Sequence, residues 1–280
     1  MSYNHNKETI SVLTFNILAP CYKRLSSESD RESLHPNLWL NRHQSIIDLI
    51  QSLNLDLICL QEYWLSEKSF IELYQSILST KYSFHYVQRT HNLADGLAIL
   101  IDRHRFQLVN KVDLLLNDIG NRVGLLLHLN FREHPLILVN IHLTFPHDSF
   151  DIELRLKQMT KFLQMIDEYI NKLDLFDRCS IILCGDLNSP FENDPVYQLL
   201  NQYFKSSYCC VHGLEPLVTH LTHRNEELCT DFIFFRSNRL TPTSSELFPK
   251  DCDPSLWKNQ QNNPWKLSDH RALQSDFEFK

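Results

Sequence analysis

Six short polar motifs stand at the ends of apolar runs, and they carry the side chains that hydrolysis of a phosphate ester needs. In chain order they are Leu13–Asn16, Cys59–Glu62, Asn140–Leu143, Gly185–Asn188, Thr230–Phe232 and Ser268–His270. Because an apolar run of about four to eight residues predicts a buried strand, the Asn, Asp, Glu and His at its end are expected at the rim of a sheet. Such oxygen ligands suit a hard divalent cation, and imidazoles beside it complete a site for cutting a phosphate ester.

Asp186 and Asn188 form the strongest of these motifs. They stand two residues apart at a strand end, so their side chains point the same way and offer a proton acceptor and a neutral donor. A β-turn would also account for an isolated pair of this kind. Glu62 follows the apolar run Leu57–Leu60, and a buried carboxylate there is either paired or bound to a metal. Taken alone, Glu62 is equally well explained as a helix cap or a salt-bridge partner, and Asn16 as a turn residue.

Two histidines and their acidic neighbours supply the imidazole chemistry. His142 ends a very apolar run, where a solitary histidine is more often a satisfied core residue. Asp269 and His270 are adjacent, so both reach one site only where the backbone turns. Asp231 begins another apolar run and is a candidate partner for a histidine, because a carboxylate fixes the imidazole tautomer or holds the ring protonated.

The elements that position these residues are predicted from apolar periodicity. Strands are expected at residues 10–16, 55–60, 82–88, 96–101, 106–115, 123–130, 136–142, 180–185, 231–235 and 271–279. Helices are expected at 38–53, 66–79, 149–172 and 194–202, with Ser149 as the N-cap of the third. Many strands and fewer helices in mixed order predict two packed sheets with helices outside. The polar stretches 23–36 and 250–266 predict long loops beside the site.

Length and composition predict one intracellular domain. With 280 residues and 43% hydrophobic content, the chain is expected to bury a large core as a single domain over 1–280, with 1–8 as a flexible tail. The N-terminus lacks the apolar segment of a secretory signal, and no apolar run approaches the length of a membrane span. The protein is therefore expected in the cytoplasm, with the nucleus as the alternative, and not outside the cell. The cysteines are expected to be free thiols, since none has zinc spacing.

The formal net charge of −7 disfavours tight nonspecific binding to a nucleic-acid backbone. It is compatible with a substrate held by a metal and a few local cations. The local cations chosen as substrate contacts are Arg89, His220 and Arg224. Asp95 and Phe145 are also predicted to contact the substrate. Asp95 is included because it precedes Gly96, one of only five glycines in the chain. A glycine beside an acid indicates close approach of the backbone to another group.

The ordered set of motifs resembles the endonuclease/exonuclease/phosphatase superfamily, the deoxyribonuclease I-like fold, over essentially the full chain. The resemblance implies an α/β fold, a four-layer α/β sandwich with two packed mixed β-sheets flanked by helices. It also implies a Mg²⁺ site at one end of the sheets, in which Mn²⁺ can substitute. Glu62 would be the principal metal ligand, with the Asn16 amide beside it and Asp269 contributing directly or through water.

The same resemblance implies catalytic roles for five further residues. Asp186 would orient or deprotonate the attacking water, Asn188 would hold a phosphate oxygen, and His142 would donate to the phosphate. His270, paired with Asp231, would stabilise negative charge as it develops on the phosphoryl group.

Three stretches resemble the branch of poly(A)-specific 3′-exonucleases that comprises deadenylases, nocturnin and Angel proteins. They are Thr14–Pro20 with Trp39–His43, Asp95–Leu100, and Cys184–Pro190 with Val196–Leu200. Residues 142–148 and 219–225 also resemble plant members that carry calcium-binding EF-hands, although this chain has no D-x-D-x-D-G loop. The branch implies a 3′-exoribonuclease that hydrolyses RNA by in-line attack of water. Recruitment to RNA would then need an adaptor protein.

Other interpretations of the same motifs stay open. A sphingomyelinase-type phospholipid phosphodiesterase and a DNA endonuclease of the same superfamily share the core catalytic set. Inositol-polyphosphate phosphatases typically carry Tyr-Arg after the D-x-N motif, whereas Ser189-Pro190 follows here. A catalytically inactive binding module is the alternative of another class, and it is disfavoured because every expected polar position is filled. Nothing in the sequence indicates oligomerisation.

Overall fold

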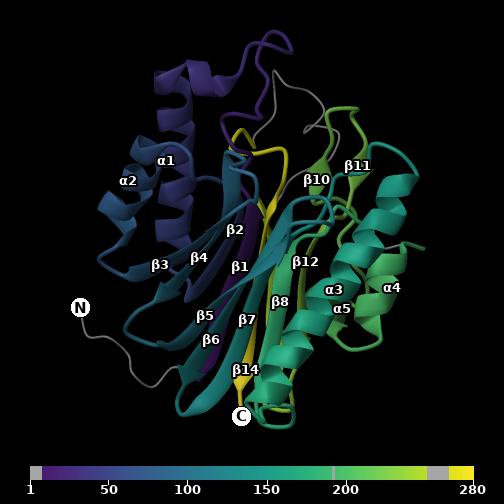
Figure 1. Ribbon diagram of the computed structural model, residues 1–280. Helices are drawn as coiled ribbons and strands as arrows, with labels where there is room; N and C mark the ends of the chain where they lie inside the picture. Colours follow the sequence, from purple (N-terminus) through teal and green to yellow (C-terminus); the bar gives the residue numbers. More distant parts are fainter. Residues whose placement is uncertain (1–7, 191–192, 251–264) are drawn as a thin grey trace.

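The computed structural model describes residues 8–190, 193–250 and 265–280. The flexible tail predicted over 1–8 and the loop predicted over 250–266 fall almost wholly outside the described residues. Within them, the chain folds into two packed β-sheets with helices on both outer faces (Figure 1). This arrangement confirms the predicted α/β sandwich.

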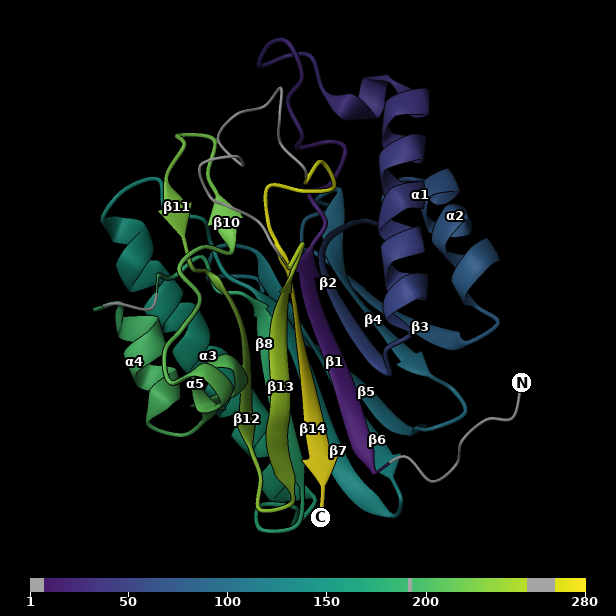
Figure 2. The same cartoon turned by 180° about the vertical axis from the view of Figure 1, so that it is seen from behind.

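The first sheet has six strands in the order β13-β14-β1-β2-β4-β3. β1 runs parallel to β2 and antiparallel to β14, so the first and last strands of the chain lie side by side (Figure 2). The bounds of these strands are β1 Thr9–Asn16, β2 Leu57–Trp64, β3 Tyr82–Gln88, β4 Asp95–Asp102, β13 Leu240–Phe248 and β14 Ala272–Phe279.

The second sheet also has six strands, in the order β5-β6-β7-β8-β12-β9. β7 and β8 are parallel, and β12 returns antiparallel to β8. The bounds are β5 Gln107–Leu116, β6 Arg122–Phe131, β7 His134–His142, β8 Ser180–Asp186, β9 Lys205–Ser206 and β12 Asp231–Arg236. A small hairpin of β10 (His220–Leu221) and β11 (Glu227–Leu228) stands beyond this sheet.

The longer helices cover the outer faces of the two sheets. Helices α1 (Pro36–Leu53) and α2 (Lys68–Leu78) cover the first sheet, and α3 (Phe150–Lys172) and α4 (Pro195–Asn201) cover the second (Figure 1). The short α5 (Ser207–His212) packs against β12 and β13, and the 3₁₀ helix η1 (Glu32–Leu34) precedes α1. Among the described residues, none of the helices combines the length and the apolar composition that a membrane crossing requires.

The central strands of both sheets are apolar on both faces because each lies between two other layers. In β1, Val12 packs in the core between the sheets, whereas Leu13 packs under α1 and α2. In β8, Cys184 faces the core between the sheets and Leu183 faces the helical layer of α3 and α4. Successive side chains of a strand point to opposite faces, so a strand that is buried on both faces shows a continuous apolar run. The packing therefore accounts for the runs from which the strands were predicted.

All ten predicted strands and all four predicted helices occur, with their ends shifted by a few residues. The sequence does not predict β13 or α5. β13 is largely polar and contains Pro242, which an edge strand tolerates, and α5 is too short to show a helical period. Ser149 stands at the N-cap position of α3, as predicted, but its side chain makes no capping bond. The neighbouring carboxylate of Asp148 accepts the backbone N–H of Phe150 at 2.8 Å instead.

Candidate active site

The ends of the central strands of both sheets meet at one edge of the sandwich. In the first sheet, Asn16 at the end of β1 pairs with Gln61 of β2. In the second sheet, Asp186 at the end of β8 lies between His142, which ends β7, and Asp231, which begins β12. The side-chain amide of Asn16 donates to Asp186 Oδ2 at 3.0 Å, so a hydrogen bond joins the two sheets at this edge.

Glu62 lies on the first-sheet side of this edge, and two donors hold its carboxylate. Asn16 Nδ2 donates to Oε1 at 3.2 Å, and the backbone N–H of Ala19 donates to Oε2 at 3.0 Å. Glu62 has a φ of 55° and stands at a β-bulge, where the register between β2 and β4 shifts. A side chain is rarely tolerated in this left-handed conformation, so the bulge stores local strain that aims the carboxylate into the site.

Other carboxylates surround Glu62 and make it a weak acid. Desolvation and the charges of Asp269 and Asp95 raise the pKa of Glu62 to about 7. Asp95 itself is buried and paired: it accepts a hydrogen bond from the Tyr22 hydroxyl at 2.6 Å and lies 3.3 Å from Arg89 Nη1. Two of the predicted substrate contacts, Arg89 and Asp95, therefore bind each other beside the site.

Asp186 is the residue that contacts both halves of the site. Besides the bond from Asn16, it accepts the backbone N–H of Asn188 at 2.9 Å, and its Oδ2 lies 3.4 Å from His142 Nε2 and 3.6 Å from His270 Nε2. Desolvation raises the pKa of Asp186 to about 6, against the charge of His270, which lowers it. Asp186 is thus a buried carboxylate that gains and loses a proton close to neutral pH.

The turn after Asp186 depends on Gly185 and Asn188. Gly185 has a φ of 146°, and a Cβ there would lie 1.8 Å from the backbone oxygen of Ile141. The close approach of backbone that the sequence predicts from this glycine therefore occurs, between β8 and β7. The side-chain amide of Asn188 donates to Leu143 O at 3.0 Å and lies 3.1 Å from His142 Nε2.

Asp231 and His270 form a buried ion pair, with His270 Nδ1 2.9 Å from Asp231 Oδ2. Thr219 Oγ1 also donates to this carboxylate oxygen, at 2.7 Å. Burial alone would lower the pKa of His270, but the charges of Asp231 and Asp186 outweigh it and raise the pKa to about 10. His270 is therefore an imidazolium at neutral pH. By contrast, burial and the charges of Arg122 and Arg89 hold the pKa of His142 well below its usual range.

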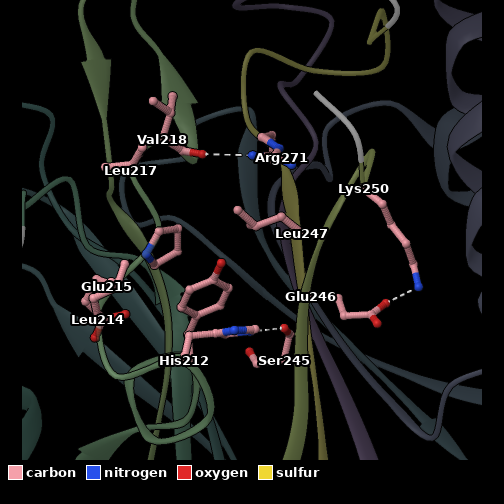
Figure 3. Close-up of a pocket in the computed structure, with 12 residues that line it drawn as sticks. His212, Leu214, Glu215, Leu217, Val218, Ser245, Glu246, Leu247, Lys250 and Arg271 are labelled. Carbon is pink, nitrogen blue, oxygen red and sulfur yellow. Dashed lines mark hydrogen bonds and ion pairs between the residues drawn. The ribbon is translucent and has the colours of Figure 1, made fainter. Parts of the chain in front are cut away.

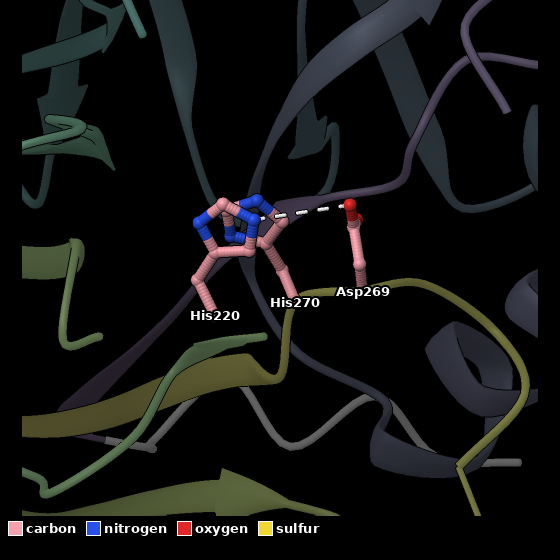
Figure 4. Close-up of side chains that lie close together, drawn as sticks. All are labelled: His220, Asp269 and His270. Carbon is pink, nitrogen blue, oxygen red and sulfur yellow. Dashed lines mark ion pairs between the residues drawn. The ribbon is translucent and has the colours of Figure 1, made fainter. Parts of the chain in front are cut away.

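His220 packs face to face on His270, with ring centroids 3.8 Å apart and planes 14° apart (Figure 4). Its Nε2 lies 3.8 Å from Asp269 Oδ2. Phe145 is beside it, with ring centroids 6.3 Å from His220 and 5.6 Å from the exposed His223. These rings extend from His270 to the exposed His223. Arg224, another predicted contact, lies in the exposed turn between β10 and β11.

The residues of the site fit a divalent cation. Among the described residues, two groups of three candidate ligands occur: His220 with Asp269 and His270, and Asp186 with Asp231 and His270. Glu62 belongs to neither group, but the acidic neighbours that raise its pKa would be stabilised by a cation. Its carboxylate oxygens are the ligands that Mg²⁺ and Mn²⁺ prefer. Asn16 turns its amide nitrogen to Glu62 and its oxygen to Leu18 N–H, at 3.0 Å, which suits it to orient that carboxylate.

Sequence analysis does not identify several residues that complete this site. Tyr22 holds Asp95, Thr219 holds Asp231, and Ser268 fixes the turn by donating to the backbone oxygen of Asn16 at 2.7 Å. Arg122 begins β6 at the same edge and is buried. Like Asp231, Arg122 directly precedes an apolar run. This position is the sequence signal that marks it as a residue at a strand end.

A separate cavity of about 530 Å³ lies between the segment around residues 212–218 and strand β13 (Figure 3). Val218 and Arg271 line it, and these residues are the chain neighbours of Thr219 and His270. Arg271 spans the wall by donating to the backbone oxygens of Val218, at 3.4 Å, and Pro249, at 2.6 Å. The cavity therefore shares two chain neighbours with the site but is lined by none of its predicted residues.

The geometry agrees with the comparison of this chain with known families. The profile of the Endonuclease/Exonuclease/phosphatase family matches residues 13–270, which include every residue of the site. The chain belongs to this family. An uncharacterized calcium-binding protein of Arabidopsis thaliana is 38% identical over 248 residues, which cover 81% of this chain and 51% of the relative. Human protein angel homolog 2 is 31% identical over 212 residues, which cover 71% of this chain and 38% of the relative. The chain thus spans about half or less of the length of these curated relatives.

Solved structures of the family share the fold. ANGEL2, described as a 2′,3′-cyclic phosphatase in complex with adenosine-2′,3′-vanadate, superposes with a TM-score of 0.78 at 22% identity, over 97% of this chain and 96% of that chain. The human nocturnin catalytic domain with bound sulfate superposes with a TM-score of 0.73 at 23% identity, over 97% and 94% of the two chains. The predicted deoxyribonuclease I-like fold and the resemblance to the Angel and nocturnin branch are confirmed.

Proposed function

We propose that this protein is a Mg²⁺-dependent phosphodiesterase that acts on the 3′ end of RNA, as a 3′-exoribonuclease on poly(A). The position of Asp186 supports this most strongly. It contacts Asn16 on the Glu62 side of the site and lies 3.6 Å from His270 on the other. A proton acceptor between an acidic, cation-binding half and a cationic half suits attack of water on a phosphate.

Asp186 would orient the attacking water and accept its proton. With a pKa of about 6 it is mostly ionised at pH 7 and is a stronger base than an ordinary carboxylate. The backbone N–H of Asn188 and the amide of Asn16 fix its two oxygens. Because both donors belong to the ends of buried strands, the carboxylate is held in position before the substrate binds.

The remaining residues would bind the metal and the phosphate. A bound Mg²⁺, or Mn²⁺ in its place, would neutralise phosphate charge, and Glu62 with Asp269 would hold it. Asn188 and the neutral His142 would contact phosphate oxygens. Asp231 keeps His270 protonated, so its imidazolium can stabilise the negative charge that grows on the phosphoryl oxygens.

The relatives favour an RNA 3′ end as the substrate and suggest a second candidate reaction. The solved ANGEL2 structure is named as a 2′,3′-cyclic phosphatase with an adenosine ligand, and human angel homolog 2 is 31% identical to this chain. Opening of a 2′,3′-cyclic phosphate is also a phosphodiester hydrolysis, so it would use the same water and the same cations. Phe145 and His223, near His220, offer rings on which a terminal base would stack.

A substrate panel tests the proposal. The purified protein with Mg²⁺ is given oligo(A) with a 3′-hydroxyl, the same oligomer with a 2′,3′-cyclic phosphate, single-stranded DNA, and sphingomyelin vesicles. Release of AMP from the 3′ end supports the exoribonuclease, and ring opening without AMP release supports the second candidate. Turnover of DNA or sphingomyelin alone contradicts the RNA assignment. The Asp186→Asn variant, purified in parallel, controls for a contaminating nuclease.

A further inference from the structure

Arg122 is a buried guanidinium at the edge that carries the site, and part of it has no partner. The residue is only 8% exposed. Its Nη1 is buried without a hydrogen bond to any described residue. Its Nε lies 3.4 Å from Thr144 Oγ1, a long contact, and this hydroxyl also accepts from Gln158 Nε2 at 2.8 Å. The charge of Arg122 is therefore poorly compensated by direct contacts.

The position of Arg122 is set by the register of β6 and β7. Gly124 of β6 pairs with Ile141 of antiparallel β7, so the start of β6 lies at the edge where β7 ends in His142. The charge of Arg122 acts on His142, whose pKa is lowered by burial and by this guanidinium. In turn, the charges of Asp95, Glu62 and Asp186 act on Arg122. The guanidinium is thus within electrostatic reach of acids from both sheets, although the described residues form no ion pair with it.

Arg155 also has buried guanidinium nitrogens without a hydrogen bond, but other arginines of the described chain have a carboxylate partner that Arg122 lacks. The buried Arg42 donates to both oxygens of Glu32 and to backbone oxygens. Arg155 lies 3.0 Å from Asp194, and Arg89 lies 3.3 Å from Asp95. Buried arginines are generally paired because an unpaired buried charge costs free energy. An unpaired buried charge therefore persists mainly where the group binds a ligand.

We propose, on the basis of the phosphodiesterase function above, that Arg122 is a catalytic residue that contacts the substrate phosphate. Its Nη1 donates to a non-bridging oxygen of the phosphate under attack. The planar guanidinium matches the oxygens of a phosphate and stays charged throughout, so no proton leaves it in the reaction. With His270, it supplies a second cation to a phosphoryl group whose charge grows during attack. The remaining unpartnered donor is thereby satisfied by the substrate.

Anion binding and thermal stability together test this role. Inorganic phosphate is titrated calorimetrically into the Mg²⁺-loaded wild type, Arg122→Met and Arg122→Lys, and melting temperatures are measured without phosphate. Arg122→Met should bind phosphate at least about tenfold more weakly and lower kcat by about 10²–10³, the worth of one donor to a developing oxyanion. Arg122→Lys keeps the positive charge but lacks the planar guanidinium with its paired N–H donors. It should therefore recover part of the lost phosphate affinity and part of the lost kcat.

The melting temperature separates this role from a structural one. Removing an unpaired buried charge should leave the melting temperature of Arg122→Met unchanged or raised. Arg155→Met is the matched control, since it leaves Asp194 without its partner: it should melt at a lower temperature and bind phosphate like the wild type. A lower melting temperature with unchanged phosphate affinity in Arg122→Met, or wild-type turnover by that variant, overturns the proposal.

The two proposals fail in different ways. If the wild type hydrolyses no phosphodiester but Arg122→Met loses phosphate affinity, the phosphodiesterase function and the catalytic role are overturned and only the anion contact stands. If the wild type hydrolyses RNA and both Arg122 variants match it in kcat and phosphate affinity, the function stands and the role of Arg122 is wrong.

Discussion

The two halves of the site use the same kind of side chain, a carboxylate, with opposite electrostatic results. On the Glu62 side, a carboxylate faces other carboxylates, and with desolvation their charges raise its pKa to about 7. On the other side, Asp231 faces an imidazole and helps to raise the pKa of His270 to about 10. The charged side chains around each carboxylate, rather than the residue type, therefore decide whether that half of the site attracts a cation or carries one itself.

This difference assigns a separate task to each half. The Glu62 half has surplus negative charge, so it gains most from a divalent cation. The Asp231–His270 half carries its own cation, the His270 imidazolium. The carboxylates of the site also raise the pKa of the nearby Arg122, against the larger effect of burial. Asp186 touches both halves, and under the proposed function it would activate a water between them.

Removing the metal should have the largest effect, because it leaves the Glu62 half without its cation. EDTA is expected to abolish phosphodiester hydrolysis, and added Mg²⁺ or Mn²⁺ should restore it. A zinc-selective chelator is the control and should have little effect. Full activity in EDTA would contradict the assignment of a metal to the Glu62 half.

Substitutions of Asp186, between the halves, and of Glu62, in the acidic half, should distinguish the roles of the two carboxylates. Asp186→Asn is expected to lower kcat by about 10²–10⁴, the usual worth of general-base catalysis, and extra Mg²⁺ should not rescue it. Glu62→Gln should weaken the apparent metal affinity, so that higher Mg²⁺ partly restores the rate. Metal titrations of both variants measure this, and identical curves would refute the division of roles.

The same contrast explains what the sequence can predict about this protein. The layers and the polar strand ends are predictable because Val12, Leu13 and their equivalents are buried on opposite faces, which gives continuous apolar runs. The bulge that turns Glu62 to a φ of 55° depends on how β2 pairs with β4, and local residue preferences carry no sign of it. Stacking of His220 on His270 brings together residues from distant loops. Contacts between distant segments are set by tertiary packing, so local residue patterns predict which strand ends are polar but not which side chains meet there. The Asp231–His270 pair is the exception, and the resemblance to the family implied it.

A double-mutant cycle should show whether the cationic half acts as one unit. Asp231→Asn, His270→Ala and the double variant are each expected to lose about 10²–10³ in kcat, because the imidazolium needs its carboxylate to stay charged and oriented. Circular dichroism checks that the fold is intact. If the single losses multiply in the double variant, the two residues act independently and His270 has another orienting partner.

The smallest effect should appear in stability against pH, where the two halves titrate in different ranges. The pKa of Glu62 rises from 4.5 to about 7 on folding, and that of His270 rises from 6.5 to about 10. A raised pKa means that the folded state binds more protons, so each group contributes stability at low pH and loses it as the pH rises. Glu62 should lose its contribution between pH 4.5 and about 7, together with Asp186, and His270 between pH 6.5 and about 10.

Chemical denaturation in EDTA across this range measures both slopes and both losses of stability, each loss expected to be on the order of a few kcal/mol in the free energy of unfolding. Glu62→Gln should flatten the lower slope and spare the upper one, and His270→Gln should do the reverse. Mg²⁺ at pH 7 should stabilise the wild type more than Glu62→Gln, because the variant binds the metal more weakly. Slopes that neither variant changes would mean that the two halves are not electrostatically distinct. Their different neighbours would then have no effect on the protons they bind.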